Sequence, residues 1–458
     1  WQRRSSRRCQ SRSLYEQATD KPNLEDYLQY KSEADKFLAD WIRFGMDSVF
    51  ADPSDFMQES QRSQAEQRLV GLNAIRSNPN LCGYSITGLV DQGMTAEGLW
   101  TTFRELKPTM MEKIKDGWSP LRWCLFVEPV HGYRGQTFKL EALLANEDIL
   151  RSGEYPARIK VISPNGVIFD KTTKVNITKD DKLVIPVLCD DIMIDGVAGR
   201  YEVVAYFEHG AAPVGGRTHF FVSDPKSLPA MEETITIWES DGILEKWLND
   251  KGIKYRFFEG TPNQSREVIL IGKIDEKKAN LDNFRELARR MYQGSVAIFL
   301  TPSVFKRDDK PLGWLPLKIK GEYRWTQGWA AGRDDFAKAH PVFDGMPCNG
   351  LMDLTYYRDI IPGNSFNGQE TPTELIAGAF AVGSYQPNGY YAGMHIGSYE
   401  FGAGSFMLNT LLILDNLGKH PAADRLVINF LRYASSKIHE RIAELPDDLD
   451  NILKDTGY

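Results

Sequence analysis

The chain has 458 residues, of which 42% are hydrophobic and 26% are charged, and its formal net charge is -7. A length of this order predicts about three domains, and so mild an acidity excludes a general electrostatic attraction to nucleic acid. No apolar run approaches the roughly 20 residues that a membrane span requires, so we expect neither nucleic acid nor a membrane as a partner.

The N-terminal segment, residues 1–25, is basic. Five arginines fall within the first 13 residues and no apolar run accompanies them, which indicates a disordered tail rather than a secretory signal. The five cysteines of the chain are widely spaced and never form a C-x-x-C pair. We therefore expect no disulfide framework, no zinc site and no cofactor.

The next segment, residues 26–119, has the pattern of an α/β fold. Apolar side chains at three- and four-residue steps predict one helix within 26–50 and a second over 54–75. The short apolar run at 81–90 follows a turn and predicts a buried strand. A helix, a tight turn and a buried strand in this order are typical of α/β domains.

The pattern changes at residue 120 and again near residue 232. From 120 to 224, period-two runs such as 137–142 and 200–206 alternate with turn signals, and about seven short strands predict an immunoglobulin-like β-sandwich. From 232 to 436, fully apolar runs alternate with helical segments, which predicts a flavodoxin-like, doubly wound parallel sheet. We expect the remaining residues, 437–458, to form a charged and loosely attached tail.

The order of these parts resembles the C-terminal part of glycoside hydrolase family 2 proteins. In that family the last barrel strand reads approximately G-[FY]-x-[ILV]-x-x-x-x-D, and the run from Gly83 to Asp91 is similar to it. The phrase Glu97-Gly98-Leu99-Trp100 resembles the family's closing segment. The resemblance implies that 26–119 is the C-terminal end of a (β/α)8 barrel.

The last domain resembles the class I glutamine-amidotransferase-like, or β-galactosidase trimerisation-like, domain that some of these proteins append. The phrase His-Pro-Val-Phe-Asp-Gly-Met-Pro at 340–347 and the Gly-rich turn at 402–406 carry this resemblance. A Gly-rich turn before an apolar run fits a tight strand junction.

The resemblance implies a β-galactosidase-like hydrolase of O-glycosidic bonds, but the catalytic carboxylates are missing. Retaining glycosidases need two carboxylates about 5 Å apart. Nothing like the family's S-E-Y-G nucleophile motif precedes Tyr15, and we expect Glu16 and Glu25 to be solvated side chains. We predict no catalytic residue and no activity for the chain alone. The alternative is a non-catalytic carbohydrate-binding or oligomerisation module.

Five residues near the predicted barrel rim are candidates to line a sugar site, because strand-end residues face the substrate in such barrels. They are Thr87, Asp91, Gln92, Glu97 and Trp100, the last as a stacking platform. Packing alone is the alternative explanation. The partners implied are a carbohydrate substrate and either the missing barrel segment or a second copy of the chain.

Cysteine, histidine and aromatic residues offer alternatives to the predicted sugar site. Cys348 lies in a loop-like context that does not suit an amidotransferase nucleophile. His340, His395 and His420 lie near Pro or Gly without metal-ligand spacing, which favours surface or helix-capping roles. A group of aromatic residues could form a sugar-stacking surface, or equally pack in a core or at a subunit contact: Trp325, Trp329, Tyr356, Tyr357, Tyr385, Tyr390, Tyr391 and Tyr399.

The partial barrel should be the least stable part of the chain. A lone barrel strand within 26–117 would expose both of its hydrogen-bonding edges. We expect this segment to pack against the sandwich through Trp118 and Trp123, or to pair with a neighbouring chain.

Overall fold

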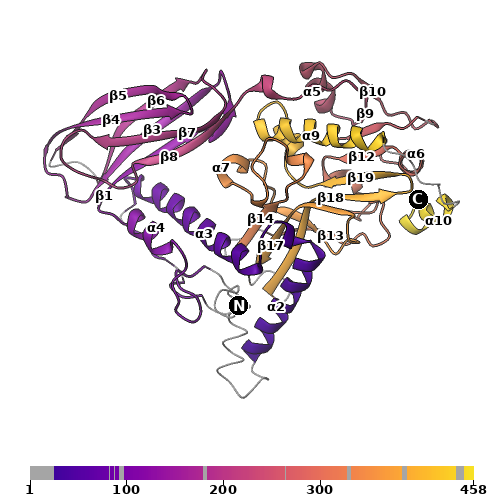
Figure 1. The fold of residues 1–458 in the computed structure, drawn as a ribbon, viewed down its shortest axis with the longest axis horizontal. Helices are drawn as coiled ribbons and strands as arrows, with labels where there is room; N and C mark the ends of the chain where they lie inside the picture. Colours follow the sequence, from indigo (N-terminus) through magenta and orange to yellow (C-terminus); the bar gives the residue numbers. More distant parts are fainter. Residues whose placement is uncertain are drawn as a thin grey trace. The chain divides into compact units, whose positions relative to one another are not determined.

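The computed structural model describes residues 25–458 except 82, 87, 92–96, 179–182, 264, 327–331, 384–388 and 440–447. The described residues form two compact units (Figure 1). Unit 1 contains 53–227 and 354–356, and unit 2 contains 25–52, 228–353 and 357–458. A mixed α/β part and an all-β part are both present, so the predicted fold class is confirmed at this coarse level.

Unit 1 begins with two helices that pack on each other, α3 (Pro53–Arg76) and α4 (Met110–Gly117). Their small shared core consists of Ala65, Leu72, Leu99, Met110 and Ile114. The described residues between the helices contain isolated bridges but no strand. The prediction of a buried strand at 81–90 is therefore wrong, since Leu81, Tyr84 and Leu89 are exposed. Their apolar side chains have too little core beneath them to bury.

The remainder of unit 1 is a β-sandwich within 121–223, as the alternating sequence predicts. One sheet has the order β1-β3-β6 and the other the order β2-β8-β7-β4-β5. Side chains from both sheets, among them Trp123, Phe138 and Tyr201, form one core. The strands are β1 (Leu121–Glu128), β2 (His131–Tyr133), β3 (Thr137–Asn146), β4 (Gly153–Ser163), β5 (Gly166–Ile177), β6 (Val184–Met193), β7 (Gly199–Phe207) and β8 (Arg217–Ser223).

Arg122 joins the two helices of unit 1 to its sandwich. Its buried guanidinium donates from Nη1 to Asn73 Oδ1 of α3 (2.9 Å) and from Nη2 to Asp116 Oδ1 of α4 (3.1 Å). Trp123 packs inside the sandwich against Phe207, with ring centroids 5.2 Å apart. Trp118 is 43% exposed, so of the two tryptophans predicted to make this junction only Trp123 is in the core.

Unit 2 is built on one mixed sheet. Five parallel strands have the order β10-β9-β11-β12-β19, and β9, β11 and β12 are buried at every position, as their apolar sequences predict. These strands are β9 (Ile235–Trp238), β10 (Tyr255–Phe257), β11 (Val268–Ile271), β12 (Val296–Phe299) and β19 (Gly404–Asn409), and the accompanying helices are α5 (Ile243–Lys251), α6 (Leu281–Tyr292), α8 (Ile413–Asn416) and α9 (Pro421–Ile438).

The sheet continues beyond β19 as an antiparallel half that the sequence analysis did not predict. The order there is β18-β17-β14-β15, with β13 and β16 paired beside it. Short 3-10 turns and helix α7 connect these strands. The bounds are β13 (Glu322–Trp325), β14 (Gly332–Ala337), β15 (Gly350–Leu351), β16 (Asn364–Asn367), β17 (Glu374–Val382), β18 (Tyr390–Phe401), η3 (Pro302–Phe305), η4 (Pro341–Phe343) and α7 (Leu354–Tyr357). The remaining 3-10 turn, η2 (Pro225–Ser227), follows β8 in unit 1.

The first described helix, α2 (Glu25–Arg43), belongs to unit 2, as does the short turn η1 (Met46–Ser48). Phe37 of α2 meets the ring of Phe380 on β17 with centroids 5.2 Å apart, and the Tyr390 hydroxyl donates to Asp40 Oδ2 at 3.0 Å. The described residues of 26–119 therefore do not form one barrel end. The apolar face of α2 is buried on the α/β sheet instead.

The C-terminal residues 448–458 are packed on unit 2. Helix α10 (Leu449–Thr456) packs against α6, and the Tyr458 ring is buried beside Phe284 and Trp314. The prediction of a loosely attached tail over 437–458 is therefore wrong for 448–458, because aromatic packing anchors this end.

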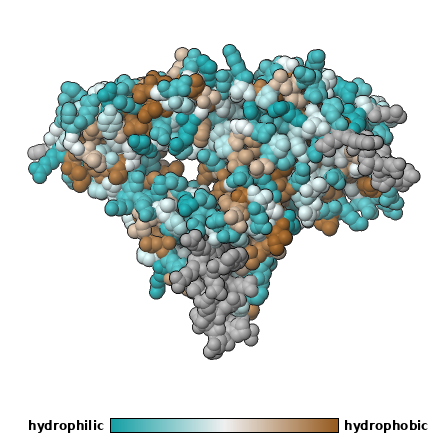
Figure 2. Space-filling model, viewed as in Figure 1, coloured by the Kyte–Doolittle hydropathy of each residue, from teal (hydrophilic) through white to brown (hydrophobic). Residues whose placement is uncertain are grey.

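The surface is mixed in character. Hydrophilic residues make up much of the visible face, and hydrophobic residues lie in several groups among them (Figure 2). Among the described residues, no helix combines the length and the apolar character that crossing a membrane requires.

Candidate functional site

Asp91, one of the two described carboxylates of the predicted rim, forms a buried ion pair. Its Oδ1 lies 2.9 Å from Lys107 Nζ and accepts a hydrogen bond from the Gly98 amide at 2.8 Å. The Lys107 ammonium also donates to the Gly98 carbonyl oxygen and, at 3.2 Å, to Gln64 Oε1. Both charged side chains are shielded from solvent. This arrangement holds the loop to α3 and leaves Asp91 no surface on which to receive a sugar.

Glu97 and Trp100 lie close to this pair but also have packing roles. A Cβ built on Gly88 would lie 2.7 Å from Glu97 Cγ, so the Glu97 side chain covers that glycine. The Trp100 ring packs on the small core below α3 and α4. The structure thus brings Asp91, Glu97 and Trp100 together, and Thr87 and Gln92 lie outside the described residues.

The carboxyl edge of the parallel sheet is where doubly wound proteins bind ligands, at the point where the strand order reverses. Here β10 and β11 flank β9, so that point lies after Trp238. Glu239 follows directly, and its carboxylate accepts hydrogen bonds from the amides of Leu244 (2.8 Å) and Glu245 (2.7 Å) at the start of α5. Burial raises the pKa of Glu239, and the two amide hydrogen bonds oppose that shift.

This edge is closed to a phosphate. The N-terminus of a helix attracts anions through its free amides and its dipole, but Glu239 already occupies that position in α5. A Cβ at Gly272 would lie 3.1 Å from the Leu244 side chain, so the neighbouring loop is packed as well. An incoming phosphate or nucleotide would have to displace an internal carboxylate.

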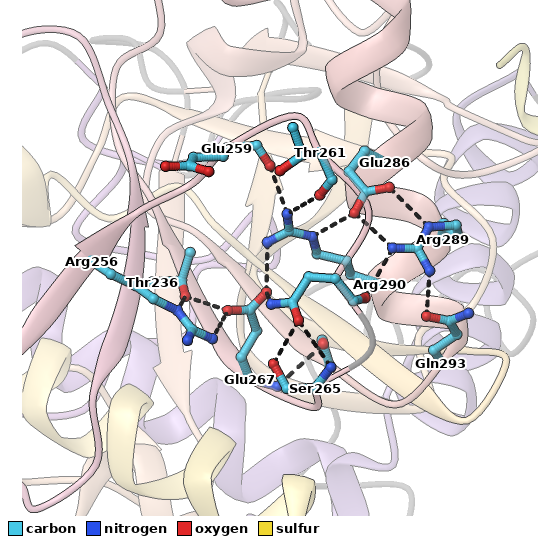
Figure 3. Close-up of polar contacts among 12 residues, drawn as sticks. Thr236, Arg256, Glu259, Thr261, Ser265, Glu267, Glu286, Arg289, Arg290 and Gln293 are labelled. Atoms are coloured by element: carbon cyan, nitrogen blue, oxygen red, sulfur yellow. Dashed lines mark hydrogen bonds and ion pairs between the residues drawn. The ribbon is translucent and has the colours of Figure 1, made fainter.

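The opposite edge of the sheet carries a denser cluster of charges, centred on Glu267 (Figure 3). Glu267 precedes β11 and accepts hydrogen bonds from Arg290 Nη1 of α6 at 2.7 Å and from Arg256 Nη2 of β10 at 2.5 Å. The Thr236 hydroxyl donates to the same carboxylate. Burial alone would raise the pKa of Glu267, but these three hydrogen bonds lower it below its ordinary value.

Arg290 extends the cluster to the loop that leads into β11. Its Nε donates to Glu286 Oε1 at 2.7 Å, and its Nη2 donates to the carbonyl oxygens of Glu259 (2.6 Å) and Thr261 (2.8 Å) (Figure 3). The Glu267 cluster therefore ties a loop to a helix. It is built as a closed network of paired charges, which suits a structural role rather than catalysis.

A third polar cluster crosses the antiparallel half of the sheet. His395 Nε2 lies 2.7 Å from Asp335 Oδ1, and its Nδ1 lies 2.7 Å from Thr410 Oγ1. Burial alone would raise the pKa of Asp335, but contacts with His395 and Arg333 lower it, and burial lowers the pKa of His395. Burial thus disfavours the charged imidazole, while the contacts with His395 and Arg333 favour the ionised carboxylate of Asp335.

This chain of carboxylate, imidazole and hydroxyl resembles a catalytic triad in its groups, but it is sealed. His395 is 0% and Thr410 2% exposed, whereas a nucleophile must reach its substrate. The surface or helix-capping role predicted for His395 is wrong: His395 lies on β18 and is one of the most buried residues of unit 2. The apolar neighbours of a buried strand histidine give no distinct sequence signal.

The other two histidines are helix caps, as the sequence analysis favoured. His340 and His420 each precede a proline and accept a backbone hydrogen bond on Nδ1, from Val342 N at 3.1 Å and from Ala422 N at 3.2 Å. Burial raises the pKa of the Cys348 thiol, which disfavours the thiolate that a cysteine nucleophile needs. The described residues contain no group of three or more His, Cys, Asp or Glu side chains that could hold a metal ion.

Half of the eight aromatic residues considered for a stacking surface belong to the core instead. Four of the tyrosines are buried, Trp325 is 57% exposed, and Tyr356 is half-buried; Trp329 and Tyr385 lie outside the described residues. The four buried side chains are Tyr357, Tyr390, Tyr391 and Tyr399.

A surface hollow of about 250 Å³, including open solvent, lies beside Arg43 and the loop around Gly368. Its polar walls are already engaged, since Arg43 Nη2 lies 2.6 Å from Asp40 Oδ1 and the Tyr399 hydroxyl donates to the Glu370 carbonyl oxygen at 3.0 Å. Ligand sites need convergent polar groups that remain available, so this hollow is a poor candidate.

Comparison with known proteins gives little more. No family model and no curated protein matches the chain. Among solved structures, an exo-β-1,4-mannosidase from Opitutaceae bacterium strain TAV5 is 12% identical, with a TM-score of 0.25, over 49% of this chain and 35% of that one. An alkylpurine DNA glycosylase from Pseudomonas fluorescens is 13% identical, with a TM-score of 0.18, over 25% of this chain and 38% of that one.

A CARDB domain from Pyrococcus furiosus is 14% identical, with a TM-score of 0.17 over 23% of this chain and 86% of that domain. The chain thus spans well under half of the length of either enzyme. The similarity to the mannosidase, a glycosidase, is weak, and similarities of this size carry no argument about mechanism.

Proposed function

We propose that the chain is a non-catalytic C-terminal part of a glycoside hydrolase family 2-like, β-galactosidase-like enzyme, with an immunoglobulin-like sandwich followed by an amidotransferase-like α/β domain. The order of the parts along the sequence supports this proposal.

One observation carries the non-catalytic part of the proposal. The buried carboxylates of the candidate clusters, Asp91, Glu239 and Glu267, are each held by a cation or by backbone amides of their own unit. A retaining glycosidase instead needs two carboxylates about 5 Å apart that both face the substrate. Carboxylates used for internal ion pairs cannot serve as the acid and the nucleophile.

The test is an assay of the purified chain with aryl β-galactosides and β-mannosides. We expect no turnover above that of the buffer, and the same result for Asp91→Asn. Turnover by the wild-type chain would contradict the proposal, and its loss in Asp91→Asn would place the active site at the predicted rim. Sequencing the locus for a frame that encodes the earlier barrel strands tests the remainder of the proposal.

A carbohydrate-binding module is the alternative, and the exposed Trp325 favours it, because exposed tryptophans serve as sugar-stacking platforms. The carbohydrate-binding alternative predicts that the purified chain is retained on insoluble polysaccharides. It also predicts that Trp325→Ala abolishes this retention, whereas the control Ile319→Ala, at an equally exposed residue, keeps it. Absence of retention would remove this alternative.

A further inference from the structure

His340 and His420 of unit 2 share one hydrogen-bonding arrangement. Each offers Nδ1 to a backbone amide, that of Val342 (3.1 Å) and that of Ala422 (3.2 Å). A backbone amide can only donate, so each Nδ1 must hold a lone pair, and each neutral ring carries its proton on Nε2. Protonation of Nδ1 would set two N–H groups against each other and remove both caps.

The surroundings of His340 combine burial with charges of both signs. Its Nε2 lies 3.5 Å from Glu374 Oε2, a carboxylate that also accepts from the Tyr433 hydroxyl, and its ring packs 4.7 Å from that of Tyr433. Burial lowers the pKa of His340, while Glu374 and Asp344 raise it and Lys437 lowers it. The neutral form is favoured in the folded state.

His420 is placed in the same way. Its Nε2 faces Asp359 Oδ2 at 3.9 Å, and Arg358 and Asp424 are the other charged groups that act on it. Burial lowers the pKa of His420, and the two carboxylates only partly offset this shift.

The caps formed by His340 and His420 both affect how helix α9 is held in place. His420 caps the N-terminus of α9 directly. His340 caps η4, and the carbonyl oxygens of Val342 and Asp344 in that turn accept hydrogen bonds from Asn429 Nδ2 of α9, both at 3.0 Å. Most of α9 is buried, including every residue from Leu426 to Leu431. A change at either histidine therefore alters how α9 is held.

We propose that α9 is an acid-sensitive element, which loosens when His340 and His420 take up protons and their caps are lost. The unfolded value for histidine is about 6.5, and both folded values lie below it. The stabilisation is therefore complete above about pH 6.5 and is lost as the pH falls below that value. Loosening exposes the buried apolar side chains of α9.

Hydrogen exchange of the full chain at pH 7.5 and pH 5.0, corrected for intrinsic rates, tests the proposal. In the wild type we expect protection over 421–438 to fall on the order of 30-fold at pH 5.0, as the loss of two caps implies, while protection in β3 and β7 is kept. The variant His340→Asn/His420→Asn should keep its protection, because Asn is a good N-cap acceptor and does not titrate. The exposed His209 supplies the control, His209→Asn, which should behave as the wild type.

Equal protection of α9 at both pH values in the wild type would overturn the proposal. An equal loss in the double Asn variant would do the same, and would point to His395 with its neighbours Asp335 and Arg333 as the titrating group. Should that variant fail to fold, the NMR titration of His340 and His420 in the wild type decides: pKa values at or above 6.5 contradict the proposal, and values below it support it.

Discussion

At the scale of single residues, Lys107 offers the sharpest test of what the predicted rim does. Its ammonium is fully shielded and lies 2.9 Å from Asp91 Oδ1. Removing one partner of a buried ion pair leaves an uncompensated charge and costs about 3–5 kcal/mol. We expect Lys107→Met to lower the free energy of unfolding of unit 1 by an amount of this order, measured by urea denaturation.

The control is Lys113→Met, because the Lys113–Glu66 pair is partly exposed and such pairs contribute about 0–1 kcal/mol. A sugar-lining role for Asp91 would give the opposite pattern, in which substitution changes ligand affinity and leaves stability nearly unchanged. Equal stability of Lys107→Met and Lys113→Met would show that the buried pair is not structural.

The sequence indicated that Asp91 and Glu97 share a region but not what they do there. The ion-pair partner of Asp91 is 16 residues away across an irregular loop, and no periodicity links such positions. The same holds for Glu267, whose partners lie on β10 and α6. Periodicity locates elements, whereas charge pairs depend on how the elements pack.

At the scale of elements, α10 depends on one aromatic side chain. The Tyr458 ring is buried near Phe284 and Trp314, and its hydroxyl donates to the Trp314 carbonyl oxygen. Truncating a buried aromatic side chain costs about 3–5 kcal/mol. We expect Tyr458→Ala to release α10, with loss of hydrogen-exchange protection over 449–456.

Tyr458→Phe should lose only the hydroxyl hydrogen bond, which is worth about 1 kcal/mol, and should keep the helix in place. Lys318→Ala is the matched control, because the Lys318–Asp455 pair is exposed. Protection of α10 that survives in Tyr458→Ala would show that other contacts hold it.

The elements that the sequence predicted are those with a clear hydrophobic pattern, either a continuous apolar run or a regular alternation of apolar and polar residues. The apolar runs of β9, β11 and β12 and the alternation of β3 and β7 correspond to observed strands. β17 and β18 were not predicted, because glycine and polar residues such as Gly378, Gly393 and His395 interrupt their buried runs, which therefore show neither alternation nor a continuous apolar stretch. Helix α2 was predicted, but its partner Phe380 lies some 340 residues later in the chain, which one local pattern cannot indicate.

At the scale of the whole molecule, the parts of unit 1 differ in how much core supports them. Helices α3 and α4 share a small core around Leu72 and Ile114, while the sandwich below them has a continuous core drawn from both of its sheets. Apolar burial is the main favourable term in folding, so the segment 53–118 should open before the rest. The segment predicted to be least stable, 26–117, is therefore reduced to 53–118, because helix α2 packs in unit 2.

Limited proteolysis with trypsin tests this order of stability. Arg104 is exposed in a turn with a positive φ of 61° between the two helices, so within residues 53–223 we expect the earliest cut after Arg104. A resistant fragment should then begin near residue 105 and contain the sandwich, since strand residues of 121–223 are hydrogen-bonded into sheets and are poor protease sites. Arg200→Gln, in the paired strand β7, should leave the pattern unchanged. First cuts within β3 or β7 would contradict the argument, because they would place the weakest region in the sandwich rather than under α3 and α4.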